Sequence, residues 1–533
     1  MPSHTKILFI AMDAGDKFLL QDWAADGTLP NLRTLFAKGL VGNVVGLEGF
    51  YEGSTWPSFY TGVTPARHGV HSLTQLKPGS YEFQHIAIGE FIKREPFWDH
   101  LSRAGRRLAI LDIPLTGIFE KLNGVQLVEW GTHDSIYGFC TWPPQLKREV
   151  LARFGPYPLT RPCDSFGLDV KEIQHFRELL FQCITRKASL TNYFFEQENW
   201  DFFAQVFTEG HCIGHQYWHL HDSGHPGYTP KAKAIVGDPV RDTYIAIDAA
   251  IGTILSHVNS ETTVVFLASH RMAHYFGMQF LLPEILRRLG VAQPMFGANS
   301  LGNSPHRKEG FNALLRRIWR NAPHKIRDKL WPIRSLLRNW IDEHKGRSSE
   351  TMYGLDLKVS KCFLLSNGDS VCGLRINLAG REPEGLVQPG ADMDSLCDQL
   401  AQDFSEIVDL DTGLPIVKSV RRTAMLYQGE HLEYLPDLLI EWNDDKSLGG
   451  NPRGSAIRVG SDKIGVVEGV YEGRRTGDHR ADGMFVAMGP GIKPGRMERV
   501  VSIMDFAPTF THLLGVELPD VDGKLITEIL GSN

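Results

Sequence analysis

The chain lacks the features that mark membrane-spanning and disulfide-rich secreted proteins. Seven cysteines are scattered over 533 residues, and an odd number without regular spacing argues against a framework of disulfide bonds. No stretch approaches the roughly 20 consecutive apolar residues that span a bilayer. The apolar run at residues 7–12 is short and leads into Asp13 without a small-residue cleavage site, unlike a signal peptide. We therefore expect a cytoplasmic protein with reduced thiols.

The chain also lacks an excess of positive charge and any internal repeat. Its 56 Lys and Arg against 62 Asp and Glu give a formal net charge of −6, which excludes a globally basic nucleic-acid binder, so we expect no nucleic-acid duplex as partner. Hydrophobic residues make up 42% and charged residues 22%, as in ordinary globular proteins. The length allows one large domain or several smaller ones.

Apolar strand-like segments alternate with helical ones along most of the chain. Buried strands are predicted at residues 6–11, 202–207, 262–268 and 483–488, and helices at residues 32–38, 181–196 and 244–257. This alternation predicts an α/β fold with a doubly wound, mostly parallel sheet.

A smaller α+β insertion domain is predicted within this fold. Strand-like residues 370–377 and 435–442 flank a helical segment at residues 393–404. We therefore divide the chain into the first part of a catalytic core (1–300), a basic helical insert or lid (301–350), the α+β insertion (351–450) and the last part of the core (451–533).

The basic insert carries 12 Lys and Arg against 4 Asp and Glu between residues 306 and 347, with three tryptophans interleaved. Three interpretations stay open. The stretch is a solvated helical face, a lid that attracts an anionic substrate, or a segment that lies on an anionic membrane surface as a peripheral contact.

Polar residues that carry chemistry follow several of the predicted strands. Asp13 comes after the first strand, His270 after strand 262–268, and His479 lies in a Gly-Asp-His turn before the last strand. Thr55 precedes Pro57, which is tolerated in the first turn of a helix, so Thr55 should lie at a helix N-terminus, where anions are favoured. Each of these residues alone is equally consistent with a cap or a loop position.

His211 and His215 are four residues apart, so that on a helix both rings project from one face and can hold a metal ion. Such a pair alone is more often structural, but five histidines fall within residues 211–225. Because strand ends of a parallel sheet meet at one edge, the pair could meet the residues that follow the strands. A hydroxyl near two metal ions loses its proton more easily, which suits Thr55 as a nucleophile.

The sequence resembles the type I phosphodiesterase/nucleotide pyrophosphatase family of the alkaline phosphatase superfamily. The resemblance follows the order of the chain from Asp13 to Gly491. It is carried by Ile10-Ala11-Met12-Asp13, Thr28-Leu29-Pro30-Asn31-Leu32, Thr55-Trp56-Pro57, Thr61-Gly62, Pro65, His68-Gly69, His211 to His215, Ser269-His270, Gly380 to Gly385, Leu435-Pro436-Asp437 and Gly477-Asp478-His479.

The resemblance implies a fold of alkaline phosphatase type and two divalent metal ions, Zn²⁺ first and Mn²⁺ or Fe as alternatives. One ion would be held by His211, His215 and His479, and the other by Asp13, Thr55 and His270. It further implies that Thr55 attacks phosphorus, that a phospho-threonine forms, and that water hydrolyses it. The substrate would be a small phosphate ester with a phosphodiester or pyrophosphate bond.

Two departures from the family pattern leave alternatives open. The family has aspartate at the positions of His211 and Ser269, so the second ion loses an anionic ligand, for which Asp16 or His274 could compensate. The alternatives are a phosphonate or sulfate monoester hydrolase, a phosphoryl transferase, and a non-catalytic metal- or ligand-binding relative.

The sequence does not identify the natural substrate, the oligomeric state or the residues that form the walls of the pocket. Phe50, Tyr51 and Trp56 either stack on the leaving group or belong to the core. Asn367, Arg375 and Arg381 either reach the substrate or, for Arg381, form a structural ion pair.

Overall fold

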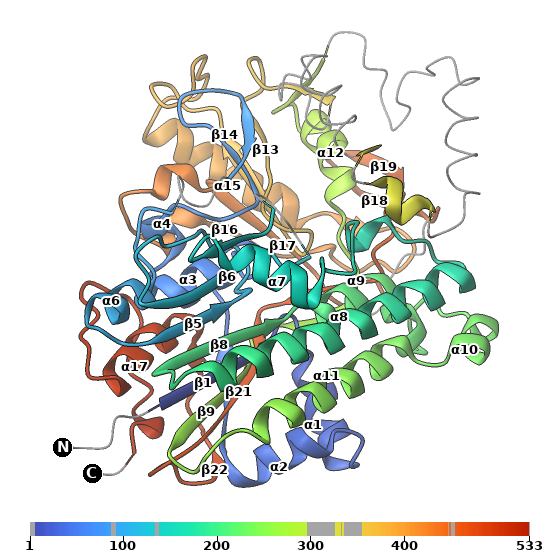
Figure 1. Cartoon of the computed structure of the whole chain (residues 1–533). Coiled ribbons are helices and arrows are strands. Elements are labelled where there is room, and N and C mark those ends of the chain that lie inside the picture. Colours follow the sequence, from blue (N-terminus) through green and yellow to red (C-terminus); the bar gives the residue numbers. More distant parts are fainter. Residues whose placement is uncertain are drawn as a thin grey trace.

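A computed structural model describes residues 6–86, 92–133, 138–295, 326–331, 333–334, 354–445, 447–448 and 454–531. A ten-stranded sheet forms the centre of this described part (Figure 1). Its order is β22 (Gly495–Arg496), β2 (Leu40–Val45), β21 (Asp482–Met488), β9 (Thr262–Ala268), β1 (Lys6–Met12), β8 (Phe202–Phe207), β5 (Leu108–Leu111), β6 (Gly124–Val128) and β7 (Cys140–Trp142), with β23 (Val501–Ser502) beside β2.

The middle of the sheet is parallel. Strands β9, β1, β8, β5 and β6 run in one direction, and β21 and β7 pair with them in the opposite direction. Strand β2 pairs antiparallel with β21. Met12 is opposite Phe207 on one side and Ala268 on the other, so β1, β8 and β9 end at the same level. This mostly parallel sheet confirms the predicted fold class.

Helices cover both faces of the sheet, because successive residues of β1 face two different cores. Leu8, Ile10 and Met12 pack with α1 (Lys17–Ala25), α2 (Pro30–Lys38), α8 (Val170–Gln197), α9 (Glu209–His221) and α11 (Pro239–Leu255). Ile7, Phe9 and Ala11 pack with α3 (Thr55–Thr61), α6 (Phe97–Arg103) and α17 (Phe506–Leu513). Figure 1 shows α8, α9 and α11 together along one face. Burial on both faces explains why these strands are apolar throughout.

The helices are longer than their apolar pattern predicts, and the difference lies at their N-termini. Helix α8 begins at Val170, eleven residues before the predicted segment, after Asp169, whose side chain accepts a hydrogen bond from the amide of Glu172. Helix α11 begins at Pro239 after the capping residue Asp238. Polar first turns lack apolar periodicity, so only the capping residues mark these starts.

The insertion has its own sheet and its own core. Strands β13 (Cys362–Leu365), β14 (Val371–Ile376), β17 (Leu438–Trp442) and β16 (Val417–Arg422) form an antiparallel sheet, and α15 (Ala391–Ser405) packs against it. In Figure 1 these strands lie above the central sheet. The predicted strands and helix of the insertion are thus present.

Two strands that follow residue 450 also pair with the insertion, and the predicted division of the chain into domains stays a prediction. Strands β18 (Ala456–Ser461) and β19 (Gly465–Val470) pair with β15 (Val408–Asp409), away from the central sheet, and the chain rejoins that sheet at β21. Helix α12 (Leu282–Arg288), before the predicted start, also packs into the insertion core. Exposed residues interrupt the apolar pattern of β18 and β19.

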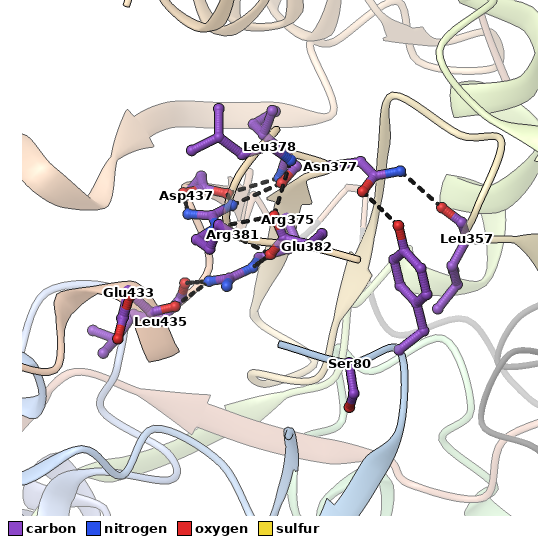
Figure 2. A network of polar contacts seen from close by, with 12 residues as sticks. Ser80, Leu357, Arg375, Asn377, Leu378, Arg381, Glu382, Glu433, Leu435 and Asp437 are labelled. Carbon is purple, nitrogen blue, oxygen red and sulfur yellow. Dashed lines mark hydrogen bonds and ion pairs between the residues drawn. The ribbon is translucent and has the colours of Figure 1, made fainter. Parts of the chain in front are cut away.

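A buried ion-pair network ties the insertion together (Figure 2). Arg375 Nε lies 2.7 Å from a carboxylate oxygen of Glu382, and Arg381 Nη2 lies 2.7 Å from Asp437 Oδ2. Both arginines are fully engaged there and lie outside the lining of the central cavity described below. Of the two interpretations of Arg381, the structural ion pair therefore fits.

Most of the basic stretch 306–347 lies outside the described residues, so its interpretations stay predictions. Residues 326–331 and 333–334 are described, and their ion pairs link them to the first half of the chain. Arg327 pairs with Glu172 of α8, and Asp328 accepts from Arg161 at 2.9 Å. Among the described residues, no helix combines the length and apolarity that crossing a membrane requires.

Candidate metal centre

The three adjacent strands β9, β1 and β8 deliver the predicted residues to one edge of the sheet. Asp13 directly follows β1, His270 follows β9 by one residue, and α9 begins two residues after β8. His211 and His215 lie one turn apart on α9. His479 comes from β20 (Gly477–Arg480), which pairs with β10 (Arg271–His274) so that Met272 is opposite His479.

His211, His215 and His479 bring three ring nitrogens together. The Nε2 atom of His479 lies 3.1 Å from Nε2 of His211 and 3.0 Å from Nε2 of His215. His215 Nδ1 lies 2.8 Å from the carbonyl oxygen of Gly477, so it is the nitrogen that carries the proton, and the lone pair is on Nε2. Zn–N bonds are about 2.0–2.1 Å long, so an ion can lie within bonding distance of all three nitrogens. The donor set fits a divalent metal.

These histidines are held in the neutral form that binds metals. Burial lowers the pKa of His211, His215 and His479 well below the usual value, and neighbouring imidazole and guanidinium groups lower it further. Burial likewise lowers the pKa of His270, against the opposing effect of the Asp13 carboxylate. A cluster of neutral rings in one place is ready for a cation.

Glycine permits the close approach that forms this cluster. A Cβ atom on Gly477 would lie 2.3 Å from the carbonyl oxygen of Gly214, the residue before His215 on α9. Strand β20 can therefore pack directly on α9 only without a side chain at position 477.

Asp13 is fixed by a tryptophan and lies beside a histidine that the sequence analysis missed. Trp56 Nε1 donates to Asp13 Oδ1 at 2.9 Å, and Asp13 Oδ2 lies 3.5 Å from His211 Nδ1. His133 Nδ1 lies 3.3 Å from the same atom of His211. One atom from each of Asp13, His133 and His211 lies within 4.8 Å of the others. The position of His133 in the sequence could have indicated it as a site residue, because it follows the parallel strand β6.

Ser269 orients His270 instead of replacing the family's aspartate as a ligand. Its Oγ lies 2.9 Å from His270 Nδ1, and the His270 ring centroid is 4.5 Å from that of His479. Neither suggested substitute lines the cavity: Asp16 caps α1 by accepting from the amides of Phe18 and Leu19, and His274 lies on β10.

Thr55 is the predicted site residue that the structure does not place at the cavity. It begins α3 as predicted, but it is 0% exposed and its hydroxyl donates to the carbonyl oxygen of Tyr51, one turn back. Trp56 lines the cavity, whereas Phe50 and Tyr51 belong to the core. Attack by Thr55 would require its hydroxyl to leave Tyr51 and turn outward.

The candidate metal ligands line a cavity of about 570 Å³, a volume that suits a small molecule. Asp13, the three clustered histidines and His270 are among its lining residues. Residues 366–369 of the insertion, which include Asn367, also line it, together with Glu52 and Arg475. The cavity therefore lies between the central sheet and the insertion.

Two carboxyl groups at this cavity have altered acidity. Burial and the nearby Asp478 raise the pKa of Glu52 well above its usual value. Burial, with the charge of Asp369 added, raises the pKa of Asp478 to about 6. Burial is the largest cause for both groups, and the guanidinium group of Arg475 acts against it.

Several solved structures of other proteins are similar to this chain at low sequence identity. The alkaline phosphatase PafA is 14% identical over 100% of both chains, with a TM-score of 0.51. Phosphonoacetate hydrolase from Sinorhizobium meliloti 1021, solved with phosphonoformate, is 11% identical over 96% of both chains, with a TM-score of 0.48. Murine ectonucleotide pyrophosphatase/phosphodiesterase 5 is 11% identical over 99% of this chain and 100% of its own, with a TM-score of 0.46. No curated protein matches the sequence.

The model of one protein family matches residues 7–349, which is more than half of the chain and includes β1, α3, α9 and β9. That match covers Asp13, Thr55, the α9 histidines and His270. The chain belongs to the type I phosphodiesterase/nucleotide pyrophosphatase family, whose members are phosphoric ester hydrolases.

Proposed function

We propose that this protein is a metal-dependent hydrolase that cleaves a phosphodiester or pyrophosphate bond of a small molecule in the central cavity. The observation that carries the proposal is the His211–His215–His479 cluster, whose Nε2 atoms lie 3.0 and 3.1 Å from that of His479. Uncharged nitrogens this close gain most from a shared cation, and Zn²⁺ suits three imidazole ligands.

When bound, such a cation would neutralise charge on the phosphate oxygens and the leaving oxygen. The chain's own residues hold the donors in place. The Gly477 carbonyl fixes the His215 ring, Ser269 fixes His270, and Trp56 fixes the Asp13 carboxylate. Outer contacts of this kind orient metal ligands and raise their basicity.

We propose that Thr55 is the nucleophile and that its hydroxyl turns toward the cavity during the reaction. Its position at the start of α3 supports it, since backbone amides at a helix N-terminus favour a phosphate oxygen. Its hydroxyl must exchange the Tyr51 carbonyl for the cavity during the reaction. The second ion that the resemblance assigns to Asp13, Thr55 and His270 has only Asp13 and His270 at the cavity in this structure.

The test is hydrolysis of bis-p-nitrophenyl phosphate beside p-nitrophenyl phosphate, phenylphosphonate and sulfate esters, with stripped protein and with Zn²⁺ or Mn²⁺ restored. We expect metal-dependent diester cleavage that His215→Ala lowers at least about 100-fold, because one ligand of the cluster is lost. His257→Ala is the matched control, since His257 pairs with Glu196 at the surface. Equal loss in both variants would contradict the assignment of the cluster.

Thr55→Val tests the nucleophile separately, because valine keeps the shape and removes the hydroxyl. We expect cleavage to fall at least about 1000-fold with metal content unchanged. A Thr55→Val variant that cleaves at the parent rate would show that another group attacks phosphorus.

A non-catalytic binding relative is the second candidate, and the inward-facing hydroxyl of Thr55 favours it. It predicts metal uptake and ligand binding without cleavage of any ester in any metal.

A further inference from the structure

Glu52 is the carboxylate of the α3 segment that lines the cavity, three residues before the buried Thr55. One ligand atom from each of Glu52, Asp478 and His479 lies within 4.8 Å of the others. This group adjoins the histidine cluster through His479 but uses neither histidine of α9. It is not part of the ligand set expected from the sequence.

The insertion is shaped around the Glu52 carboxylate. The backbone amide of Ser370 donates to Glu52 Oε1 at 3.3 Å. A Cβ atom on Gly368 would overlap the same carboxylate, with Oε2 at 2.6 Å. The turn at residues 368–370 therefore leaves room for this side chain and holds it against the cavity.

Asp478 and His479 each have a buried atom without a hydrogen-bond partner among the described residues. Asp478 is 0% exposed; Oδ2 accepts from Ser370 Oγ at 2.9 Å, whereas Oδ1 has no partner there. His479 uses Nε2 in the histidine cluster, and Nδ1 is likewise without a partner in that part of the chain. A buried polar atom without a partner costs about 1–3 kcal/mol, a cost that a bound cation would remove.

Positive charge from the protein offsets the charge of this pair of carboxylates only in part. Arg475 and Arg480 lie near enough to act on the pair electrostatically, but among the described residues neither forms an ion pair with Glu52 or Asp478. Arg475 lies 3.5 Å from Asp369, and Arg480 donates to the backbone carbonyl oxygens of His479 and His274, at 2.8 and 3.0 Å. Ser370 donates to both side chains through neutral groups, its backbone amide to Glu52 and its hydroxyl to Asp478. A cation between the two carboxylates would supply the charge that these neutral donors do not.

We propose that Glu52, Asp478 and His479 hold a divalent cation beside the one bound by the histidine cluster. Two carboxylates and one imidazole suit Mn²⁺ or Zn²⁺. The His479 ring would then lie between the two ions, with Nε2 toward the histidine cluster and Nδ1 toward the carboxylates. The proposal deepens the proposed function, on which its role in hydrolysis rests, but the binding itself is measurable without turnover.

The test is metal content of the full chain after equilibration with Mn²⁺ or Zn²⁺ and gel filtration, with the affinity of each step measured by calorimetric titration. Glu52→Gln keeps an oxygen for the Ser370 amide and removes the charge, so the variant should fold and lose about one ion per chain relative to the parent. Gly368→Ala, which fills the space of the carboxylate without changing any charge, should lose the same ion.

Two comparison variants make the result specific. Glu48→Gln removes a carboxylate from the same segment, but Glu48 is exposed and pairs with Arg421, so it should keep the parent's metal content. Glu120→Gln, at an exposed position, should keep it as well. Circular dichroism and thermal unfolding verify that each variant is folded.

The outcomes separate this proposal from the function. If folded Glu52→Gln keeps every ion at parental affinity, the proposed cation site is wrong even when diester hydrolysis is present. If Glu52→Gln and Gly368→Ala lose one ion while no variant or parent cleaves any ester, the site stands and the proposed hydrolysis is wrong. Loss of an equal amount of metal in Glu48→Gln would also overturn the site, because it would make the effect one of general charge.

Discussion

At the scale of single residues, the sequence predicts the position of Thr55 at the start of a helix but not the direction of its hydroxyl group. Thr55 follows the family pattern and begins a helix, yet its hydroxyl bonds to the preceding turn. Back-bonding of this kind is common for threonine within a helix and is invisible in a motif. Glu52, which no motif marks, faces the cavity because Gly368 leaves space for it.

Asp99 gives a prediction about pH at the same scale. It lies in the first turn of α6, is 5% exposed, and its Oδ1 has no hydrogen-bond partner among the described residues. Burial, with the charge of Glu95 added, raises the pKa of Asp99 to about 7. The folded state therefore keeps a proton that the unfolded state loses near pH 4, and the free energy of unfolding falls as pH rises from about 4 to about 7.

Asp99→Asn removes this titration without changing the shape of the side chain. Because one pKa unit corresponds to about 1.4 kcal/mol, we expect the variant's gain in unfolding free energy over the parent to be about 2 kcal/mol larger at pH 8 than at pH 5. Urea unfolding at both values measures it. Glu120→Gln, at an exposed position, should show no such difference. A gain that is equal at pH 5 and pH 8 would mean that Asp99 is ionised in the folded protein.

At the scale of elements, the apolar pattern of the sequence predicted the strands of the central sheet well. It predicted the elements that contact them only in part. Strands β8 and β9 have the predicted bounds because both faces of each are buried, and the carboxyl-end position of Asp13 and His270 follows from parallel pairing. The short strand β20 was not predicted, since four residues carry no periodicity. Its pairing with β10, which places His479, depends on contacts between distant parts of the chain.

Gly477→Ala tests the packing of β20 on α9. The added Cβ would lie 2.3 Å from the Gly214 carbonyl oxygen, so β20 must move away and carry His479 with it. We expect a loss of about 2 kcal/mol in stability and a weaker hold on the first metal ion, although no ligand is changed. Thermal unfolding and metal titration measure both effects.

Gly224→Ala is the control for this substitution, because the nearest atom to its Cβ is a side-chain oxygen of Asp222 at 3.2 Å. It should bind metal like the parent. Parental affinity in Gly477→Ala would mean that the histidine cluster does not depend on the approach of β20 to α9.

At the scale of the whole molecule, the cavity joins two parts that have separate cores. His211, His215 and His270 lie on or after elements of the central layer, whereas residues 366–369, which line the same cavity, belong to the insertion. The sequence predicted both parts of the chain but not the contact between them. Composition and pattern mark segments along the chain and do not show which segments meet in space. Ser370 makes that contact through Glu52 and Asp478, so metal bound there should stabilise the insertion against the sheet.

Metal removal and loss of the insertion's ion pairs should therefore have different signatures in thermal unfolding. An ion at 100 times its dissociation constant adds about 2.7 kcal/mol to the folded state, so chelation should lower the unfolding temperature of the parent by more than that of His215→Ala, which lacks a ligand of the histidine cluster but keeps Glu52, Asp478 and His479. Arg381→Met breaks the buried pair with Asp437, which costs about 3–5 kcal/mol, and lies away from the cavity, so it should lower the unfolding temperature with or without metal. If Arg381→Met instead abolished the response to metal while still folded, the network in Figure 2 would be part of the metal site and not only of the insertion's fold.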